Sequence, residues 1–163
     1  DETTQIGPVV DSRQFNQNKE YIESAITEGA TMAAGDETIN TDNGFYMRPT
    51  LFIDTKNDMK INREEVFGPI ACVIKVKDYK EALSVSNDSN FGLSSGIVTQ
   101  SLKHASHFKR YSASGCVMVN LPTAGTDYHV PFGGRKSSSY GPREQGQYAK
   151  EFFTVVKTSY ISS

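Results

Sequence analysis

Apolar positions along the chain switch between two spacings, and each switch predicts a change between strand and helix. Short β-rich runs alternate with longer stretches in which apolar residues recur every three or four positions. Strands alternating with helices favour an α/β fold with a largely parallel sheet. Strands are predicted at 30–34, 49–54, 70–76, 94–99 and 115–120, helices at 11–29, 78–88, 101–113 and 142–153, and a short helix or turn at 57–66.

The first predicted helix carries its own start and stop signals. Asp11 is a plausible N-cap, and Gln14 three residues later completes a capping box. Gly29 can end the helix in the left-handed conformation. Helical spacing places three apolar side chains on one face, which we expect to be the buried one. These side chains are Phe15, Ile22 and Ile26.

Two later helices have similar caps, Asp78 for 78–88 and Ser101 for 101–113. The 142–153 helix has Pro142 in its first turn, where a missing N–H costs nothing. An apolar stripe is expected to bury the 101–113 helix. This stripe consists of Leu102, Ala105 and Phe108.

The segments between these elements differ in what they predict. Asn43-Gly44 is a strong turn signal. The loop 121–141 is long for a compact domain, which indicates function or disorder, and its apolar side chains argue against disorder. The last residues, "TVVKTSYIS", are strongly β-prone.

Composition and charge narrow the class of protein. Hydrophobic residues make up 37% of the 163 residues and charged residues 22%, which is typical of a soluble globular protein. A net charge of −2 gives no reason to expect nucleic acid or an anionic membrane as partner. The longest apolar run, 70–74, is far too short to span a bilayer. We therefore expect a cytoplasmic protein.

The two cysteines are predicted to be packing residues. Cys72 and Cys116 lie in apolar strand patterns, without the cationic neighbour or helix N-terminus that activates a thiol. Free buried thiols fit a reducing compartment, although spacing alone leaves a single disulfide open.

Several short motifs fail on their surroundings. Lys136-Ser137 is preceded by Arg135 where a phosphate-binding P-loop needs Gly. His104 and His107, three apart on a helix, could touch one metal, but no Cys or carboxylate accompanies them. A solvated helix face is the favoured interpretation of this histidine pair, and no metal is expected.

Two stretches are not explained by packing, "REEVFGP" at 63–69 and "VPFGGRK" at 130–136. Adjacent residues do not share a face on a helix or a strand, so Glu64 and Glu65 cannot form a close carboxylate dyad. One acid is expected to be solvated while the other points into a site. In the second stretch, Pro131 and two glycines shape a tight loop that presents Phe132.

"EEVFGP", then "PFGGRKSSSYGPREQG", then a final "FFTVVKTSY", resemble the aldehyde dehydrogenase superfamily over essentially the whole chain. The run "LPTAGTDYHVPFGGRK" looks most like members that oxidise α-ketoglutarate semialdehyde. The resemblance implies a three-layer α/β/α sandwich with a largely parallel sheet. It also implies NAD or NADP as cofactor, an aldehyde as substrate and covalent catalysis by a cysteine thiolate.

The resemblance also assigns roles residue by residue. Glu65 matches a glutamate that holds the nicotinamide ribose, and Phe67 an aromatic beside the nicotinamide. Phe132 matches an aromatic of the aldehyde tunnel, and Tyr128 and His129 just before it are expected to influence substrate choice. No catalytic residue is assigned, because the family's nucleophile, its general base and its dinucleotide-binding domain match no part of this sequence.

The sequence is therefore expected to be the C-terminal part of such an enzyme and inactive alone, which would explain its abrupt start at Asp1. Residues 1–153 would form part of the catalytic domain, and 154–163 an oligomerisation strand that pairs in a homo-oligomer, a dimer or a tetramer. Two alternative hypotheses fit the same residues. One is a stand-alone non-catalytic assembly or regulatory module, and the other is a small-molecule binding domain that uses the "PFGG" loop. Lys136, Arg143 and Glu144 are expected to be structural.

Overall fold

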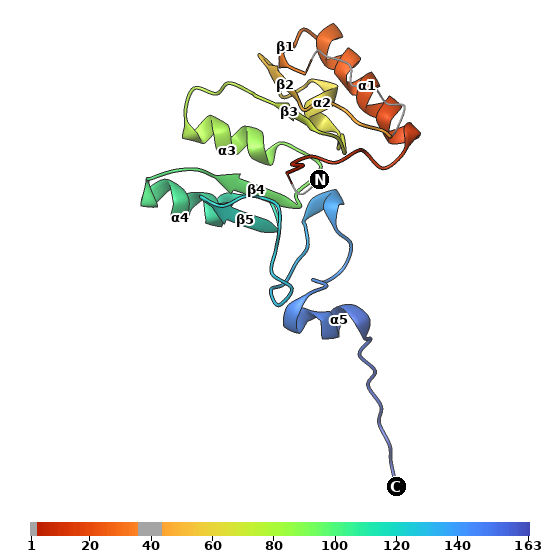
Figure 1. Ribbon diagram of the computed structural model, residues 1–163. Coiled ribbons are helices and arrows are strands. Elements are labelled where there is room, and N and C mark those ends of the chain that lie inside the picture. Colours follow the sequence, from red (N-terminus) through yellow and green to blue (C-terminus); the bar gives the residue numbers. More distant parts are fainter. Residues whose placement is uncertain (1–2, 36–43) are drawn as a thin grey trace. The chain divides into compact units, whose positions relative to one another are not determined.

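The computed structural model describes residues 3–35 and 44–163 (Figure 1). The chain divides into two compact units, Asp1–Val76 and Lys77–Ser163. Each is described by itself. In chain order the elements are α1 (Ser12–Thr27), β1 (Thr31–Ala34), β2 (Thr50–Ile53), α2 (Lys60–Arg63), β3 (Ile70–Cys72), α3 (Tyr79–Asn87), β4 (Ser94–Ile97), α4 (Leu102–Tyr111), β5 (Cys116–Val119), the 3-10 turns η1 (Lys136–Ser138) and η2 (Gly146–Tyr148), and α5 (Ala149–Phe153).

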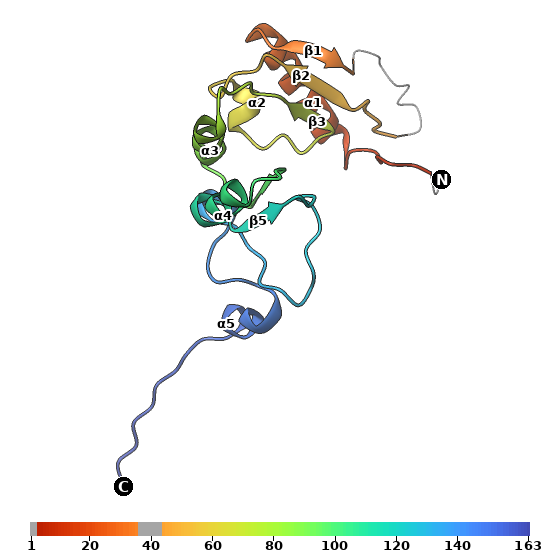
Figure 2. The same cartoon turned by 90° about the vertical axis from the view of Figure 1, so that its left-hand side faces the viewer.

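The first unit is a three-stranded sheet in the order β1-β2-β3, with α1 along one face (Figures 1 and 2). β1 and β2 are antiparallel, with Met32 opposite Phe52, and β2 and β3 are parallel, with Phe52 opposite Cys72. The fully buried ring of Phe52 therefore lies in the middle of the sheet and contacts the helix layer. The buried cluster around it consists of Tyr21, Ala25, Ala30, Met59 and Ile61.

Helix α1 begins and ends where the sequence predicts. The Asp11 side chain accepts a hydrogen bond from the Gln14 backbone N–H at 2.8 Å, and Gly29 has a φ of +96°. The predicted buried face is only partly right: Ile22 packs against the buried cluster, but Ile26 is 51% exposed. The buried row is instead Asn18, Tyr21 and Ala25. One of these three, Asn18, is polar and another, Ala25, is small, so counting large apolar residues did not identify the row.

The second unit contains the parallel pair β4 and β5, with Gly96 opposite Met118. Asp78 and Ser101 cap α3 and α4 as predicted, each accepting a hydrogen bond from a backbone N–H three residues later. Phe108 on α4 is buried, but Leu102, at the first position of the same helix, is 81% exposed. The predicted stripe on this helix is therefore only partly buried.

The C-terminal region departs further from the prediction. The expected helix at 142–153 begins only after Gln145, with η2 and then α5, so Pro142 is not in its first turn. Residues 154–163 leave α5 as an unpaired ribbon (Figure 1) and form no strand in this single chain. In the first unit, β3 ends at Cys72, four residues earlier than predicted.

The expected fold class is confirmed: helices and strands alternate, and two of the three strand pairs are parallel. The predicted turn residue Asn43 lies outside the described residues. Among the helices that the structure describes, none has the length and apolar character needed to cross a bilayer.

Candidate functional site

The "REEVFGP" motif forms the connection between α2 and β3. Its backbone becomes extended at Glu64 and turns into the left-handed region at Phe67, where φ is +54°. A left-handed backbone costs an aromatic residue about 1–2 kcal/mol. The Phe67 ring gains little burial in return, because it is 74% exposed. A strained and exposed aromatic residue is an observation that points to a site.

Helix α1 holds the main chain of this turn. The Gln14 side-chain amide donates to the Val66 carbonyl at 2.9 Å and to the Asn18 side-chain oxygen at 2.8 Å. Asn18 is fully buried, and a Cβ added to Gly68 would lie 2.3 Å from its Nδ2 atom. Only a glycine lets the turn approach the helix this closely. The Gln14 amide is thus used for anchoring the turn, beyond the N-cap interaction of its backbone.

The two acids of the motif have different surroundings. The Tyr21 hydroxyl donates to Oε2 of Glu64 at 2.8 Å. Burial raises the pKa of the Tyr21 phenol, and its hydrogen bond to the Glu64 carboxylate raises it further. The Glu65 carboxylate is exposed and has no side-chain partner among the described residues. Glu64 is therefore held by the helix layer, and Glu65 is available to a ligand.

A hollow of about 580 Å³ lies beside the same turn, open to solvent. One wall is the turn itself at 67–69, and another is the N-terminal segment 6–10, with Gln14 between them. An exposed carboxylate, a flat aromatic ring and an adjacent hollow can together accept hydrogen bonds from hydroxyls and contact a planar ring.

The remaining predicted site residues lie on the long loop of the second unit. Tyr128 is 86% exposed, and the His129 ring meets it edge-on at a centroid distance of 5.4 Å. Phe132 is half-buried, and its carbonyl accepts a hydrogen bond from the Glu144 backbone N–H at 3.3 Å. This loop presents aromatic side chains, whereas Glu65 and Phe67 lie in the other unit.

The glycines after Phe132 anchor the loop to the strands. Gly133 and Gly134 are buried, and a Cβ added to Gly115 would lie 2.0 Å from the Gly133 carbonyl oxygen. The Gly134 carbonyl accepts from the Arg143 guanidinium, and the Arg135 backbone N–H donates to the Gly92 carbonyl at 2.9 Å. The structural assignment of Arg143 agrees with these contacts.

Lys136 is also structural. Its Nζ donates to the carbonyls of Asn87 and Ser89, each at 2.7 Å, and so binds the C-terminal end of α3. We expect Lys136→Met to lower the free energy of unfolding by about 1 kcal/mol, because both charge-assisted bonds are lost from an exposed site. Urea denaturation would measure this change. The matched control is Lys80→Met, which removes an exposed lysine of α3 itself. An equal loss in both variants would contradict the prediction.

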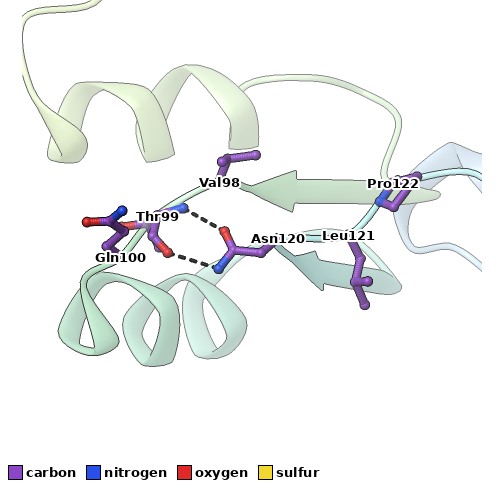
Figure 3. A pocket seen from close by; sticks show the side chains of 6 residues that line it. All are labelled: Val98, Thr99, Gln100, Asn120, Leu121 and Pro122. Carbon is purple, nitrogen blue, oxygen red and sulfur yellow. Dashed lines mark hydrogen bonds between the residues drawn. The ribbon is translucent and has the colours of Figure 1, made fainter.

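A second hollow, which the sequence did not predict, lies where β4 and β5 end (Figure 3). It measures about 690 Å³, and Val98, Leu121 and Pro122 give it an apolar lining. Asn120 spans the two strand ends: its side chain accepts from the Thr99 N–H at 2.8 Å and donates to the Thr99 carbonyl at 3.0 Å. The signal that could have found it is a polar amide directly after an apolar strand.

The cysteines behave as packing residues, whereas the predicted solvated face of the histidine pair is wrong for His104, which is half-buried. Both thiols are free and half-buried, and burial raises the pKa of the Cys72 thiol. His104 stacks on Tyr79 at 4.3 Å, and the Tyr79 hydroxyl is 2.9 Å from Nδ1 of His107. Over residues 3–35 and 44–163, no three metal-ligating side chains converge.

Comparison with known protein families shows the family of the chain. The model of the aldehyde dehydrogenase family matches residues 1–159. The chain belongs to the aldehyde dehydrogenase family. The family resemblance drawn from the two motifs is thus confirmed.

Among relatives of this aldehyde dehydrogenase chain are two semialdehyde dehydrogenases. The α-ketoglutarate semialdehyde dehydrogenase of Haloferax volcanii is 43% identical over 97% of the chain and 34% of its own length. The α-ketoglutaric semialdehyde dehydrogenase of Bacillus subtilis is 38% identical over 96% of the chain and 33% of its own length.

Solved aldehyde dehydrogenases share the fold. An indole-3-acetaldehyde dehydrogenase from P. syringae, in complex with NAD+ and IAA, matches with a TM-score of 0.90 and 35% identity, over the whole chain and 33% of its own. Apo betaine aldehyde dehydrogenase from Staphylococcus aureus matches with a TM-score of 0.89 and 30% identity, over 96% of the chain and 32% of its own. The chain therefore spans about a third of the length of these relatives.

Proposed function

We propose that the chain is the C-terminal part of an NAD(P)-dependent aldehyde dehydrogenase that oxidises an aldehyde or semialdehyde to a carboxylate. The observation that carries this proposal is the family match over residues 1–159, combined with coverage of only a third of each relative. Because the family's nucleophilic cysteine, general-base glutamate and dinucleotide-binding domain match no part of this sequence, we infer that the chain has no activity alone.

Glu65 and Phe67 are the residues that we propose for the cofactor. The exposed Glu65 carboxylate can accept from two ribose hydroxyls, at about 1.5–3 kcal/mol for each charge-assisted bond. The exposed Phe67 ring offers an apolar surface for the nicotinamide, and the hollow beside it supports the fit. A bound nicotinamide supplies the acceptor for the hydride that leaves the aldehyde carbon.

Phe132, Tyr128 and His129 are the residues that we propose for the substrate. They lie on one loop and present aromatic surface, and in Tyr128 and His129 this surface is exposed. The names of the two semialdehyde dehydrogenases above support α-ketoglutarate semialdehyde as the aldehyde. A hydroxyl and an imidazole beside the aromatic wall suit a substrate with a polar end.

The test compares the 163-residue chain with the full-length product of its gene. We expect the full-length protein to reduce NAD or NADP with α-ketoglutarate semialdehyde, followed at 340 nm, and the short chain to give no turnover. Simple aliphatic aldehydes and both cofactors complete the panel. Turnover by the short chain would show that the nucleophile lies within it, and an inactive full-length protein would refute the proposed activity.

We also propose that residues 154–163 pair with another subunit in a dimer or tetramer. These residues carry apolar side chains that are almost fully exposed, among them Val155, Val156 and Ile161. An unpaired β-prone segment of this kind favours association. Size-exclusion chromatography with light scattering should give a mass above one chain at micromolar concentration. A chain truncated at Phe153 should run as a monomer, and a monomeric untruncated chain would contradict the proposal.

The alternative function is a stand-alone non-catalytic assembly or regulatory module. The gene separates the two, because a reading frame that continues upstream into a dinucleotide-binding domain supports the enzyme, and a start codon near Asp1 supports the module. Calorimetry of the short chain with NAD or NADP tests the third option, a binding domain that uses the "PFGG" loop. The two free thiols support our expectation of a reducing, cytoplasmic compartment.

A further inference from the structure

The proposed role of Glu65 requires that one of two adjacent acids is directed at the ligand and the other is not. Glu64 and Glu65 have the same side chain, and both are exposed on the same turn. Two adjacent carboxylates repel each other, which favours placing them on different sides of the chain. This repulsion does not determine which of the two faces the ligand. The structure contains one contact that breaks this equivalence.

That contact comes from Tyr21 on α1. Its side chain is only 6% exposed and belongs to the buried cluster with Phe52 and Ile61. The Lys60 ammonium lies 5.1 Å from the ring centroid, which adds a second restraint on the ring. A ring fixed in this way presents its hydroxyl at one position, where it donates to Oε2 of Glu64 at 2.8 Å.

The backbone conformation at Glu64 relates the direction of its side chain to that of Glu65. Glu64 has φ −116° and ψ 158°, which is extended. In extended backbone, successive side chains leave on opposite sides. Because the Tyr21 hydroxyl holds Glu64 against α1, we infer that the exposed side chain of Glu65 leaves on the side away from the helix.

We propose that Tyr21 is a positioning residue for the cofactor: by binding Glu64, its hydroxyl directs Glu65 towards the nicotinamide ribose. This inference rests on the proposed function of Glu65. Two sets of contacts to α1 then have different effects on the turn. Gln14 and Asn18 fix the main chain at Val66 and Gly68, whereas Tyr21 fixes which acid faces outward. The hydroxyl can be removed while the buried ring stays in place.

The test uses the full-length protein and four single variants: Tyr21→Phe, Glu64→Ala, Glu64→Gln and Glu65→Gln. Stopped-flow measurement of the first turnover gives the rate constant of hydride transfer with NAD or NADP. Binding of ADP, which has no nicotinamide ribose, is measured in parallel by calorimetry. Thermal melts of all variants check that they are folded.

We expect Tyr21→Phe and Glu64→Ala each to lower the rate constant about 10-fold. This is less than the roughly 100-fold that a misplacement of about 1 Å can cost, because the Glu65 carboxylate itself is retained. A double variant, Tyr21→Phe/Glu64→Ala, is added to these four and should be no slower than either single one, because both changes remove the same contact. Glu64→Gln retains an oxygen that accepts from Tyr21, so it should recover most of the rate lost in Glu64→Ala. The dissociation constant of ADP should stay within about twofold, since a positioning role is confined to the nicotinamide half.

The outcomes distinguish a failure of the Tyr21 inference from a failure of the proposed role of Glu65. If Glu65→Gln slows hydride transfer and Tyr21→Phe does not, Tyr21 has no positioning role, although the proposed function stands. If Tyr21→Phe weakens ADP binding as much as it slows hydride transfer, the effect is general damage and the inference fails. If Glu65→Gln matches the unaltered protein, the ribose assignment itself is wrong.

Discussion

Gly115→Ala is expected to lower the free energy of unfolding by about 3 kcal/mol, at the upper end of the cost of overpacking. A Cβ at this position would lie 2.0 Å from the Gly133 carbonyl oxygen and 2.8 Å from the Gly134 Cα. Both obstacles are backbone atoms, so no side chain can rotate away. The start of β5 or the 131–135 loop must therefore move, and urea denaturation followed by circular dichroism would measure the cost.

The matched control for this variant is Gly96→Ala on the neighbouring strand β4. There the nearest atom to an added Cβ is the terminal methyl of Thr123, at 2.9 Å, and this exposed side chain can move. We expect a change within about 0.5 kcal/mol. Equal losses for the two variants would mean that the backbone approach at Gly115 has no special cost. In the full-length protein, Gly115→Ala should also raise the KM for the aldehyde, because the loop that must move carries Phe132.

Gly68→Ala is expected to have the second largest effect, a loss of about 2 kcal/mol in the free energy of unfolding. The added Cβ would lie 2.3 Å from Nδ2 and 2.6 Å from Cγ of Asn18, which has no exposed surface. Gly7→Ala is the control, because no atom lies within 4 Å of its added Cβ. In the full-length protein we also expect weaker binding of the nicotinamide cofactor, since the turn that carries Glu65 is displaced.

A double variant tests the reason for this loss. Asn18→Ala removes the obstructing amide, together with its contacts to Gln14 and to the Met47 sulfur at 3.3 Å. If Asn18 is the obstacle, the loss in Gly68→Ala/Asn18→Ala should fall short of the sum of the single losses by about 1 kcal/mol. Strict additivity would place the strain elsewhere in the turn.

The sequence predicted the elements well because their signals are local. Caps such as Asp11 and Asp78 act within four residues, so the chain shows them without any knowledge of its tertiary contacts. The strands at β1, β2, β4 and β5 follow from short β-rich runs bounded by turn residues. The end of β3 and the state of 154–163 depend on which strands are available to pair, and local pattern cannot supply that.

The candidate site could be expected from the sequence only through its motifs. The contact that distinguishes Glu64 from Glu65 is the hydrogen bond from Tyr21, which lies 43 positions from Glu64 in the chain. The need for glycine at 68 depends on Asn18, a buried polar residue that hydrophobic patterning assigns to the surface. Contacts of this kind join distant positions through single side chains, and one sequence contains no periodic signal for them.

The Asn120 amide has a consequence for how the β4–β5 ladder ends. In a parallel ladder, a residue whose N–H binds the Ile97 carbonyl would use its own main-chain carbonyl to accept from Thr99. Asn120 has φ +55°, which turns that carbonyl away, and its side-chain oxygen accepts the Thr99 N–H in its place. A side chain thus forms the last rung of the sheet. The main chain leaves the ladder one residue early, and the loop that follows starts without leaving the Thr99 N–H unpaired.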